Sequence, residues 1–207
     1  RGVLPVRPVR RGGPMREAIL RKVRESADTK LRFFEENAEM LERCARDAAA
    51  RFQSGARLFV MGNGGSACDA QHMAVEFQHP IVEKRKALPA MALTADSATL
   101  TAIGNDSDFS RVFAEQLDIM SRSGDIALGI STSGASTNVH RGLKRARELG
   151  LMTIGFSGRD GGRMNEVCDY SFVVKSWSIH RIQETHTTLL HLFWDLVQVA
   201  GGEDDVL

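Results

Sequence analysis

The sequence predicts an α/β protein built on a five-stranded, doubly wound parallel sheet flanked by helices. Three observations support this fold class. Five short apolar runs follow Gly55, and amphipathic segments with a helical repeat separate them. Each run is continuous rather than alternating with polar residues, as in parallel strands that are covered on both faces. Two of the runs end in loops rich in glycine or serine, where such folds place their ligands.

The positions of these runs give the expected elements. Strands are expected at residues 58–61, 90–93, 126–130, 152–156 and 170–174. Helices are expected at residues 67–78, 96–103, 109–120, 135–149 and 181–199, with a short turn at 162–167. In a doubly wound sheet the loops after Met61 and Ile130 then meet at the carboxyl ends of strands.

Residues 15–53 have apolar side chains at steps of three and four, which is typical of helices. The polar stretch 26–29 predicts a break, so two amphipathic helices are expected, with apolar faces suited to subunit packing. We therefore divide a single domain, 15–200, into N-terminal helices at 15–54 and an α/β part at 55–200, followed by an acidic tail at 201–207. Residues 1–14, with three of the five prolines, are expected to be a disordered tail or an extension before a natural start at Met15.

Composition narrows the classes of partner. The 207 residues include 27 basic and 26 acidic side chains, for a net charge of +1, which gives no argument for nucleic acid or an anionic membrane surface. No apolar run approaches the roughly 20 residues that span a bilayer. Three widely spaced cysteines without a CxxC pair favour reduced thiols. We therefore expect a cytoplasmic protein that binds neither nucleic acid nor a membrane.

The loop at residues 62–66 predicts an anion site. Its glycines leave backbone N–H groups accessible, a helix begins near Ser66, and the Ser66 hydroxyl adds a donor. Further along this helix, His72 and Glu76 are four residues apart and share one face, as a metal site or a proton-transfer pair requires. The loop also fits the GxGxxG/A dinucleotide pattern, but no acidic residue ends the next strand to hold a ribose, so dinucleotide binding is disfavoured.

A second loop, residues 131–136, predicts phosphate binding. It offers four hydroxyls within six residues at the start of a helix, whereas an ordinary N-cap needs only one. The lysine of a nucleotide-binding P-loop is absent. The last helix, 181–199, is strongly apolar yet carries Gln183, Glu184, His186 and His191. A histidine such as His186 in this setting is more often a hydrogen-bonded core residue than a catalyst, although burying several polar groups favours a site.

Four segments carry a family resemblance. They read GNGGSACDAQHMAVE, LTAIGNDSDFSRVFAEQL, GDIALGISTSGAS and RIQETHTTLLH, in that order. In sequence and spacing they resemble the phosphoheptose isomerases (sedoheptulose 7-phosphate isomerases) of the sugar isomerase, or SIS, superfamily, over residues 34–199. The resemblance implies conversion of sedoheptulose 7-phosphate to D-glycero-D-manno-heptose 7-phosphate through an enediol, the first step of nucleotide-activated heptose biosynthesis. It also implies a homotetramer with active sites between subunits.

The resemblance assigns residues to roles. Glu76 is implied as the base or proton carrier and His191 as its acid/base partner. One zinc ion per site is implied, with His72, Glu76, Gln183 and His191 as ligands. The expected substrate contacts, which include those of the two loops, are Asn63, Gly64, Gly65, Ser66, Glu76, Asn105, Asp106, Ser131, Thr132, Ser133, Ser136 and Gln183. In one regular helix, however, Gln183 and His191 lie about 12 Å apart. Either Gln183 precedes the regular helix, or the two ligands come from different subunits.

The chain also departs from the family pattern. Pro80 stands where the family usually has an arginine, for which Arg85 is a possible substitute, and His180 stands where some members have an aspartate. These changes leave open another sugar-phosphate isomerase of the superfamily. A second alternative is a non-catalytic SIS protein that binds the replication initiator DnaA. That branch looks different at the counterparts of Glu76, His191 and Ser133, so their presence here favours catalysis.

Overall fold

A computed structural model describes residues 15–81 and 85–205. The expectation for residues 1–14 lies outside the described residues. The chain forms a five-stranded sheet in which every pairing is parallel, with strand order β2-β1-β3-β4-β5. The strands are β1 (Leu58–Gly62), β2 (Ala90–Ala92), β3 (Ile126–Ser131), β4 (Met152–Gly158) and β5 (Tyr170–Val174). The predicted fold class is therefore confirmed, and each strand overlaps the run that predicted it.

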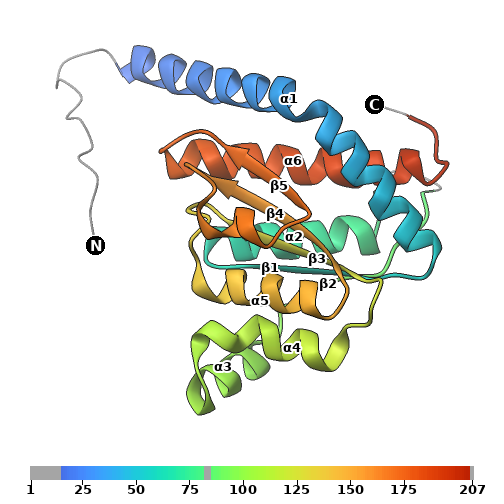
Figure 1. The fold of residues 1–207 in the computed structure, drawn as a ribbon. Helices are drawn as coiled ribbons and strands as arrows, with labels where there is room; N and C mark the ends of the chain where they lie inside the picture. The colour runs from blue at the N-terminus through green and yellow to red at the C-terminus, as the bar shows by residue number, and fades with distance from the viewer. Residues whose placement is uncertain (1–14, 82–84, 206–207) are drawn as a thin grey trace.

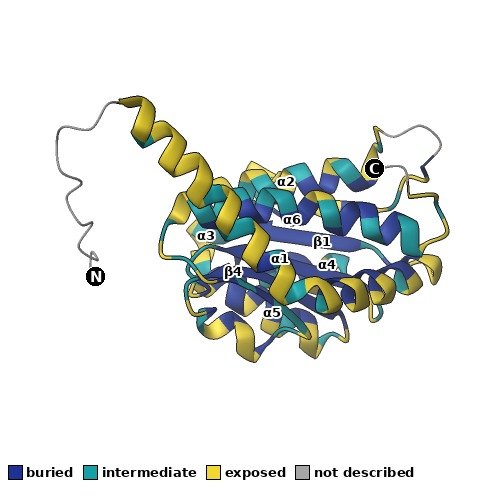
Figure 2. Ribbon diagram, turned by 90° about the horizontal axis from the view of Figure 1, so that it is seen from above, coloured by how far each residue is buried: buried dark blue, intermediate teal, exposed yellow. Residues whose placement is uncertain are grey.

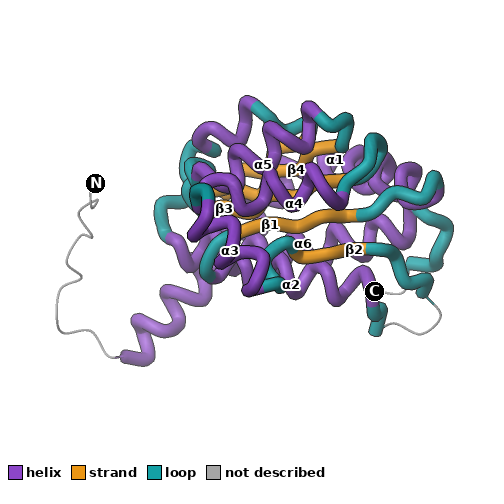
Figure 3. The backbone as a smooth tube through the Cα atoms, turned by 90° about the horizontal axis from the view of Figure 1, so that it is seen from below, coloured by secondary structure: helices purple, strands orange, loops and turns teal. Residues whose placement is uncertain are grey.

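Helices cover both faces of the sheet, as Figure 1 shows. One face packs against α1 (Met15–Gln53), α2 (Gly65–Gln78) and α6 (Ile179–Ala200). The other face packs against α4 (Val112–Met120), α5 (Thr137–Glu148) and the short helix η2 (Gly162–Glu166), with α3 (Ser97–Asp106) and η1 (Phe109–Arg111) leading into α4. Figure 3 shows the strands lying side by side behind α3, α4 and α5.

The sheet has two apolar cores because its strands are buried on both faces. Phe156 and its neighbours at alternate positions point towards α1, α2 and α6, whereas Phe59 and Met61 point towards α4 and α5. All residues of β1, β3 and β4 are buried, which explains why these strands read as continuous apolar runs. Within the described ranges, no helix combines the length and the apolar character that crossing a bilayer requires.

Residues 15–53 form one helix, so the predicted break at 26–29 is wrong. The polar side chains there are satisfied without ending the helix. Ser26 Oγ donates to Glu184 of α6 at 2.6 Å, and Thr29 Oγ1 donates to the Glu25 carbonyl one turn earlier at 2.7 Å. The second half of α1 packs on α6, while the first half projects beyond the body of the domain with mostly exposed side chains (Figure 2).

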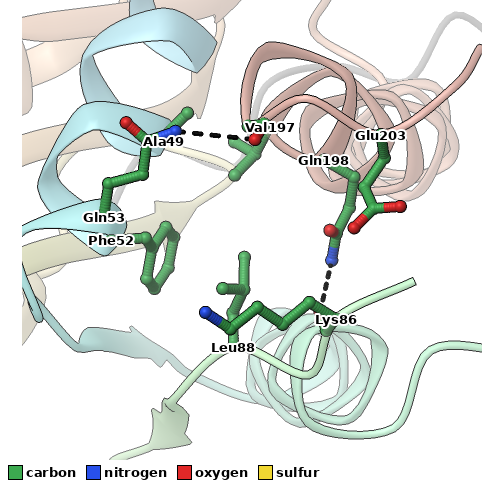
Figure 4. Close-up of a pocket in the computed structure, with 9 residues that line it drawn as sticks. Ala49, Phe52, Gln53, Lys86, Leu88, Val197, Gln198 and Glu203 are labelled. Atoms are coloured by element: carbon green, nitrogen blue, oxygen red, sulfur yellow. Dashed lines mark hydrogen bonds between the residues drawn. The ribbon is translucent and has the colours of Figure 1, made fainter. Parts of the chain in front are cut away.

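The two ends of the sheet differ in character. The carboxyl ends of β1 and β3 lead into the two loops that the sequence analysis singled out. At the opposite end, α1 and α6 terminate beside residues 86–88 and enclose a cavity of about 90 Å³ (Figure 4). There the Gln198 side chain donates to the Lys86 carbonyl at 2.9 Å, which ties α6 to the segment that follows α2. The candidate site therefore lies at one end and a structural tie at the other.

Candidate active site

The two predicted loops meet, because β1 and β3 are neighbours and both end at this edge. A reciprocal pair of amide hydrogen bonds joins them. Asn63 Nδ2 donates to Asn138 Oδ1 at 2.9 Å, and Asn138 Nδ2 donates to Asn63 Oδ1 at 2.8 Å. Asn138 is only 4% exposed, in the first turn of α5. Sequence reasoning missed Asn138, since a lone asparagine near a helix start carries no signal of a partner 75 residues away.

The hydroxyls of the second loop cluster at the N-terminus of α5. Ser131 Oγ lies 2.9 Å from Ser136 Oγ and 3.4 Å from Ser133 Oγ. Ser136 is the N-cap residue of α5, yet its side chain makes no capping bond. Gly134 has a φ of +62°, and a Cβ there would collide with the Gly161 carbonyl oxygen. The loop therefore gathers hydroxyl donors at a positive helix end, which is the chemistry of a phosphate site.

The first loop leads into α2 through Gly64, whose φ of +57° favours glycine. Ser66 is buried in the first turn of α2, and its backbone N–H donates to the Asn63 carbonyl at 3.1 Å. Gly65 faces α6: a Cβ at this position would collide with the Gln183 side chain. A larger residue at Gly65 would have to displace the Gln183 side chain where α2 and α6 approach each other.

Three candidate metal ligands converge where α2 packs on α6. His72 Nε2 lies 3.2 Å from Glu76 Oε1 and 3.2 Å from His191 Nε2. One ligand atom from each residue lies within 4.8 Å of the others. Around a tetrahedral zinc ion with bonds of about 2.0–2.1 Å, neighbouring ligand atoms are about 3.3 Å apart. The two separations of 3.2 Å match this value, and two imidazoles with a carboxylate are a donor set that suits zinc.

Gln183 lies apart from this cluster. It belongs to the regular part of α6, beside Gly65, two turns before His191. The alternative that Gln183 precedes the helix is therefore wrong. About 12 Å of helix rise separates the backbone positions of the two residues, and the Gln183 side chain lies against Gly65 rather than against the His72 cluster. Only the alternative with two subunits remains for a shared ion.

Two further titratable groups lie at the packing surface of α6. Burial raises the pKa of Asp69, in part offset by His72, and its Oδ2 is buried without a hydrogen-bond partner. His186 is fully buried, and burial lowers its pKa to about 4. Its Nε2 lies 3.0 Å from the Ser157 carbonyl, so Nε2 carries the proton and the ring is neutral. This geometry supports the interpretation of His186 as a hydrogen-bonded core residue rather than a catalyst.

Asn105 and Asp106 are the last two residues of α3, and both are exposed. The Asn105 amide donates to the Asp106 carboxylate at 2.7 Å. His180 is exposed in the first turn of α6.

Arg85 is not free to replace the missing arginine, so that expectation is wrong. Its guanidinium pairs with Asp195, lies 4.9 Å from the Trp194 ring and is 8% exposed.

This fold and site define a sugar isomerase domain. Residues 23–158 match the model of the SIS domain family, to which the chain belongs. Within it, the chain is a member of the phosphoheptose isomerases. It is 45% identical to the phosphoheptose isomerase of Aquifex aeolicus over 89% of this chain and 96% of that protein. It is 47% identical to the phosphoheptose isomerase of Desulfovibrio desulfuricans over 87% of this chain and 86% of that protein.

Solved structures agree with this assignment. The phosphoheptose isomerase GmhA of Neisseria gonorrhoeae superposes with a TM-score of 0.84 at 35% identity, covering 90% of this chain and all of that one (100%). The phosphoheptose isomerase of Francisella tularensis superposes with a TM-score of 0.86 at 30% identity, with the same coverage of 90% and 100%. The resemblance inferred from the four sequence segments is confirmed.

Proposed function

We propose that the chain catalyses the conversion of sedoheptulose 7-phosphate to D-glycero-D-manno-heptose 7-phosphate. The observation that carries this proposal is the convergence of His72, Glu76 and His191 at the contact between α2 and α6. Moving a proton between C1 and C2 through an enediol needs a base for a carbon-bound proton and an acid at oxygen. A carboxylate beside two imidazoles supplies both. Similarity to proteins named phosphoheptose isomerases supports the choice of substrate.

Glu76 is the proposed base. Its side chain is 14% exposed and one of its oxygens faces His72, so the carboxylate is oriented and partly withdrawn from water. His191 is exposed on α6 and is the proposed partner that exchanges a proton with the sugar oxygens. Its Nε2 faces His72, which leaves Nδ1 for proton transfer. Base and acid therefore come from different helices and act on adjacent atoms of the substrate.

His72, Glu76 and His191 are also the proposed ligands of a divalent ion, most suitably zinc. When bound, the ion would polarise the substrate carbonyl and stabilise the negative charge of the enediolate. Gln183 would join these ligands only from a second copy of the chain, because it lies two turns away along its own helix. Within its own chain, Gln183 is next to the glycine loop, which supports its proposed role as a substrate contact.

The phosphate group is proposed to bind to the serine loop, through Ser131, Thr132, Ser133 and Ser136. Their hydroxyls bond mainly to one another, so a phosphate would replace weak mutual contacts with charge-assisted ones. Asn63, Gly64, Gly65 and Ser66 would contact the sugar from the facing loop. The reciprocal amide pair with Asn138 supports this role by fixing the distance between the two loops.

A homotetramer with shared sites is the proposed assembly. Asn105 and Asp106 are exposed, so a substrate held by a second copy could reach them. The projecting half of α1 carries exposed apolar side chains, which favours packing against another subunit. These are Met15, Ile19, Leu20, Val23 and Leu31.

Turnover of sedoheptulose 7-phosphate tests the proposal. The protein is stripped of metal, restored with zinc, and followed by NMR detection of the aldose heptose phosphate, with Glu76→Gln as the matched variant. We expect zinc-dependent product with the wild-type chain and a loss of at least about 100-fold in kcat with the variant, as for removal of a general base. No turnover by intact, zinc-loaded protein would shift the assignment to another sugar phosphate or to partner binding.

A further inference from the structure

The residues assigned to the phosphate carry no positive charge. Ser131, Thr132, Ser133 and Ser136 are neutral, whereas a sugar phosphate is close to a dianion at neutral pH. A cation near this loop would therefore add attraction that the hydroxyls do not supply. The turn after β4 lies directly against the loop. A Cβ at Gly158 would sit 2.7 Å from the Thr132 carbonyl oxygen, and a Cβ at Gly162 would sit 2.9 Å from the Ser133 carbonyl oxygen.

Arg159 occupies an unusual backbone position in this turn. The Gly161 N–H donates to the Gly158 carbonyl at 3.0 Å, so Arg159 is the first central residue of a β-turn. Its φ is +60°, the only positive φ of a non-glycine residue in the described part of the chain. A turn with positive φ at this residue alone normally has glycine there. An arginine at this position costs conformational energy, which suggests that its side chain has a function.

The Arg159 side chain is held but not neutralised. Its guanidinium lies 5.6 Å from the centroid of the Trp177 ring, and Trp177 is itself 62% exposed. Nε of Arg159 is buried without a hydrogen-bond partner. Over the described ranges, this guanidinium forms no ion pair, unlike those of Arg57, Arg85 and Arg181. Cation–π contact restricts the side chain without neutralising its charge.

We propose that Arg159, oriented by Trp177, is a substrate-specificity residue that neutralises the phosphate group of the sugar phosphate bound in the adjacent serine loop. It would discriminate in favour of phosphorylated sugars and contribute to binding rather than to proton transfer. The proposal deepens the proposed isomerase function and rests on it for the identity of the substrate. Binding of a phosphate dianion beside the serine loop does not depend on turnover. The role of Arg159 and the proposed isomerase function can therefore be tested separately.

Four variants of the full, zinc-loaded chain provide the test. Arg159→Gln removes the charge, Arg159→Lys keeps it, and Arg159→Gly relieves the turn while removing the side chain. Arg163→Gln removes the same charge from an exposed position in η2, four residues further on. For each, kcat and KM for sedoheptulose 7-phosphate are measured. Affinity for inorganic phosphate is measured by calorimetry.

We expect Arg159→Gln and Arg159→Gly to raise KM and weaken phosphate binding by about tenfold or more, the size of a lost charge-assisted hydrogen bond, with kcat within about twofold. Arg159→Lys should retain most of the affinity, and Arg163→Gln should match the wild type. Arg159→Gly should keep or raise the melting temperature, because glycine adopts a positive φ without strain. If Arg159 were purely structural, its variants would lose phosphate affinity only together with a fall in melting temperature.

Three results would overturn the inference. They are unchanged phosphate affinity in Arg159→Gln, equal losses in Arg159→Gln and Arg163→Gln, and a change of oligomer mass in Arg159→Gln without a change in phosphate affinity. The last would assign the guanidinium to a carboxylate of another subunit. Failure of the wild type to turn over the heptose phosphate, with phosphate affinity still dependent on Arg159, would contradict the proposed substrate and leave this inference standing.

Discussion

Single residues carry the chemistry of this site. Spacing along one helix explains the positions of some of these residues but not of others. His72 and Glu76 were predictable as a pair because four residues bring two side chains to one face of a helix. His191 lies 119 residues from His72, so its distance of 3.2 Å depends on how α2 packs against α6. Helix periodicity gives no information on that packing. The roles of His191 and Gln183 came from the family resemblance alone.

His186 makes the folded chain sensitive to acid. Burial lowers its pKa from 6.5 to about 4, so the unfolded chain binds this proton at a higher pH than the folded chain does. Between about pH 6.5 and pH 4 the unfolded state holds more protons, and stability therefore rises with pH across this window. As pH falls through it, the free energy of unfolding should decrease by up to about 3 kcal/mol from this residue.

Urea unfolding at pH 7.5 and pH 5, on metal-stripped protein, measures this effect. Metal is removed because its affinity also depends on pH. His186→Gln, which can still donate to the Ser157 carbonyl, should show a smaller loss of stability at pH 5 than the wild type. His140→Gln is the comparison at a less deeply buried histidine of α5, whose pKa burial also lowers, and its effect should be smaller than that of His186→Gln. An equal loss in the wild type and His186→Gln would show that His186 does not titrate as described.

At the scale of elements, α1 combines two functions in one helix. Its second half belongs to the core, with Leu41, Cys44 and Ala48 buried. Its first half exposes an apolar face, on which Val23 is 60% exposed. The helix continues through residues 26–29 because Ser26 and Thr29 find hydrogen-bond acceptors in α6 and in the preceding turn. A sequence pattern that marks polar residues as breakers cannot anticipate those acceptors.

The exposed face of α1 should be needed for assembly. A charge placed at Val23 would have to be desolvated in any apolar subunit contact, so Val23→Glu should lower the mass measured by light scattering. Because the proposed site is shared between subunits, activity should fall with it. Arg21→Glu alters charge at an exposed position on another side of the helix and should leave the mass unchanged. A Val23→Glu protein of unaltered mass would exclude this face from the interface.

For the whole molecule, the sheet was predictable because each strand is covered on both faces and therefore reads as one apolar run. The meeting of the loops after β1 and β3 followed from the doubly wound topology. Contacts between distant side chains were not predictable. The amide pair of Asn63 and Asn138, the burial of Arg85 against Asp195 and the cation–π contact of Arg159 each depend on tertiary packing. The sequence thus indicated where the site lies more fully than how its parts are held.

The central claim is proton transfer through an enediol with Glu76 as the base, and solvent deuterium measures it most directly. Sedoheptulose 7-phosphate is incubated in D₂O with zinc-loaded protein for many turnovers, and its carbon-bound hydrogens are followed by NMR. The account predicts deuterium at C2 of the aldose product and at C1 of the recovered ketose, with uptake at least about 100-fold slower in Glu76→Gln. Turnover that leaves both carbons free of deuterium, or uptake that is unaffected by the substitution, would contradict it.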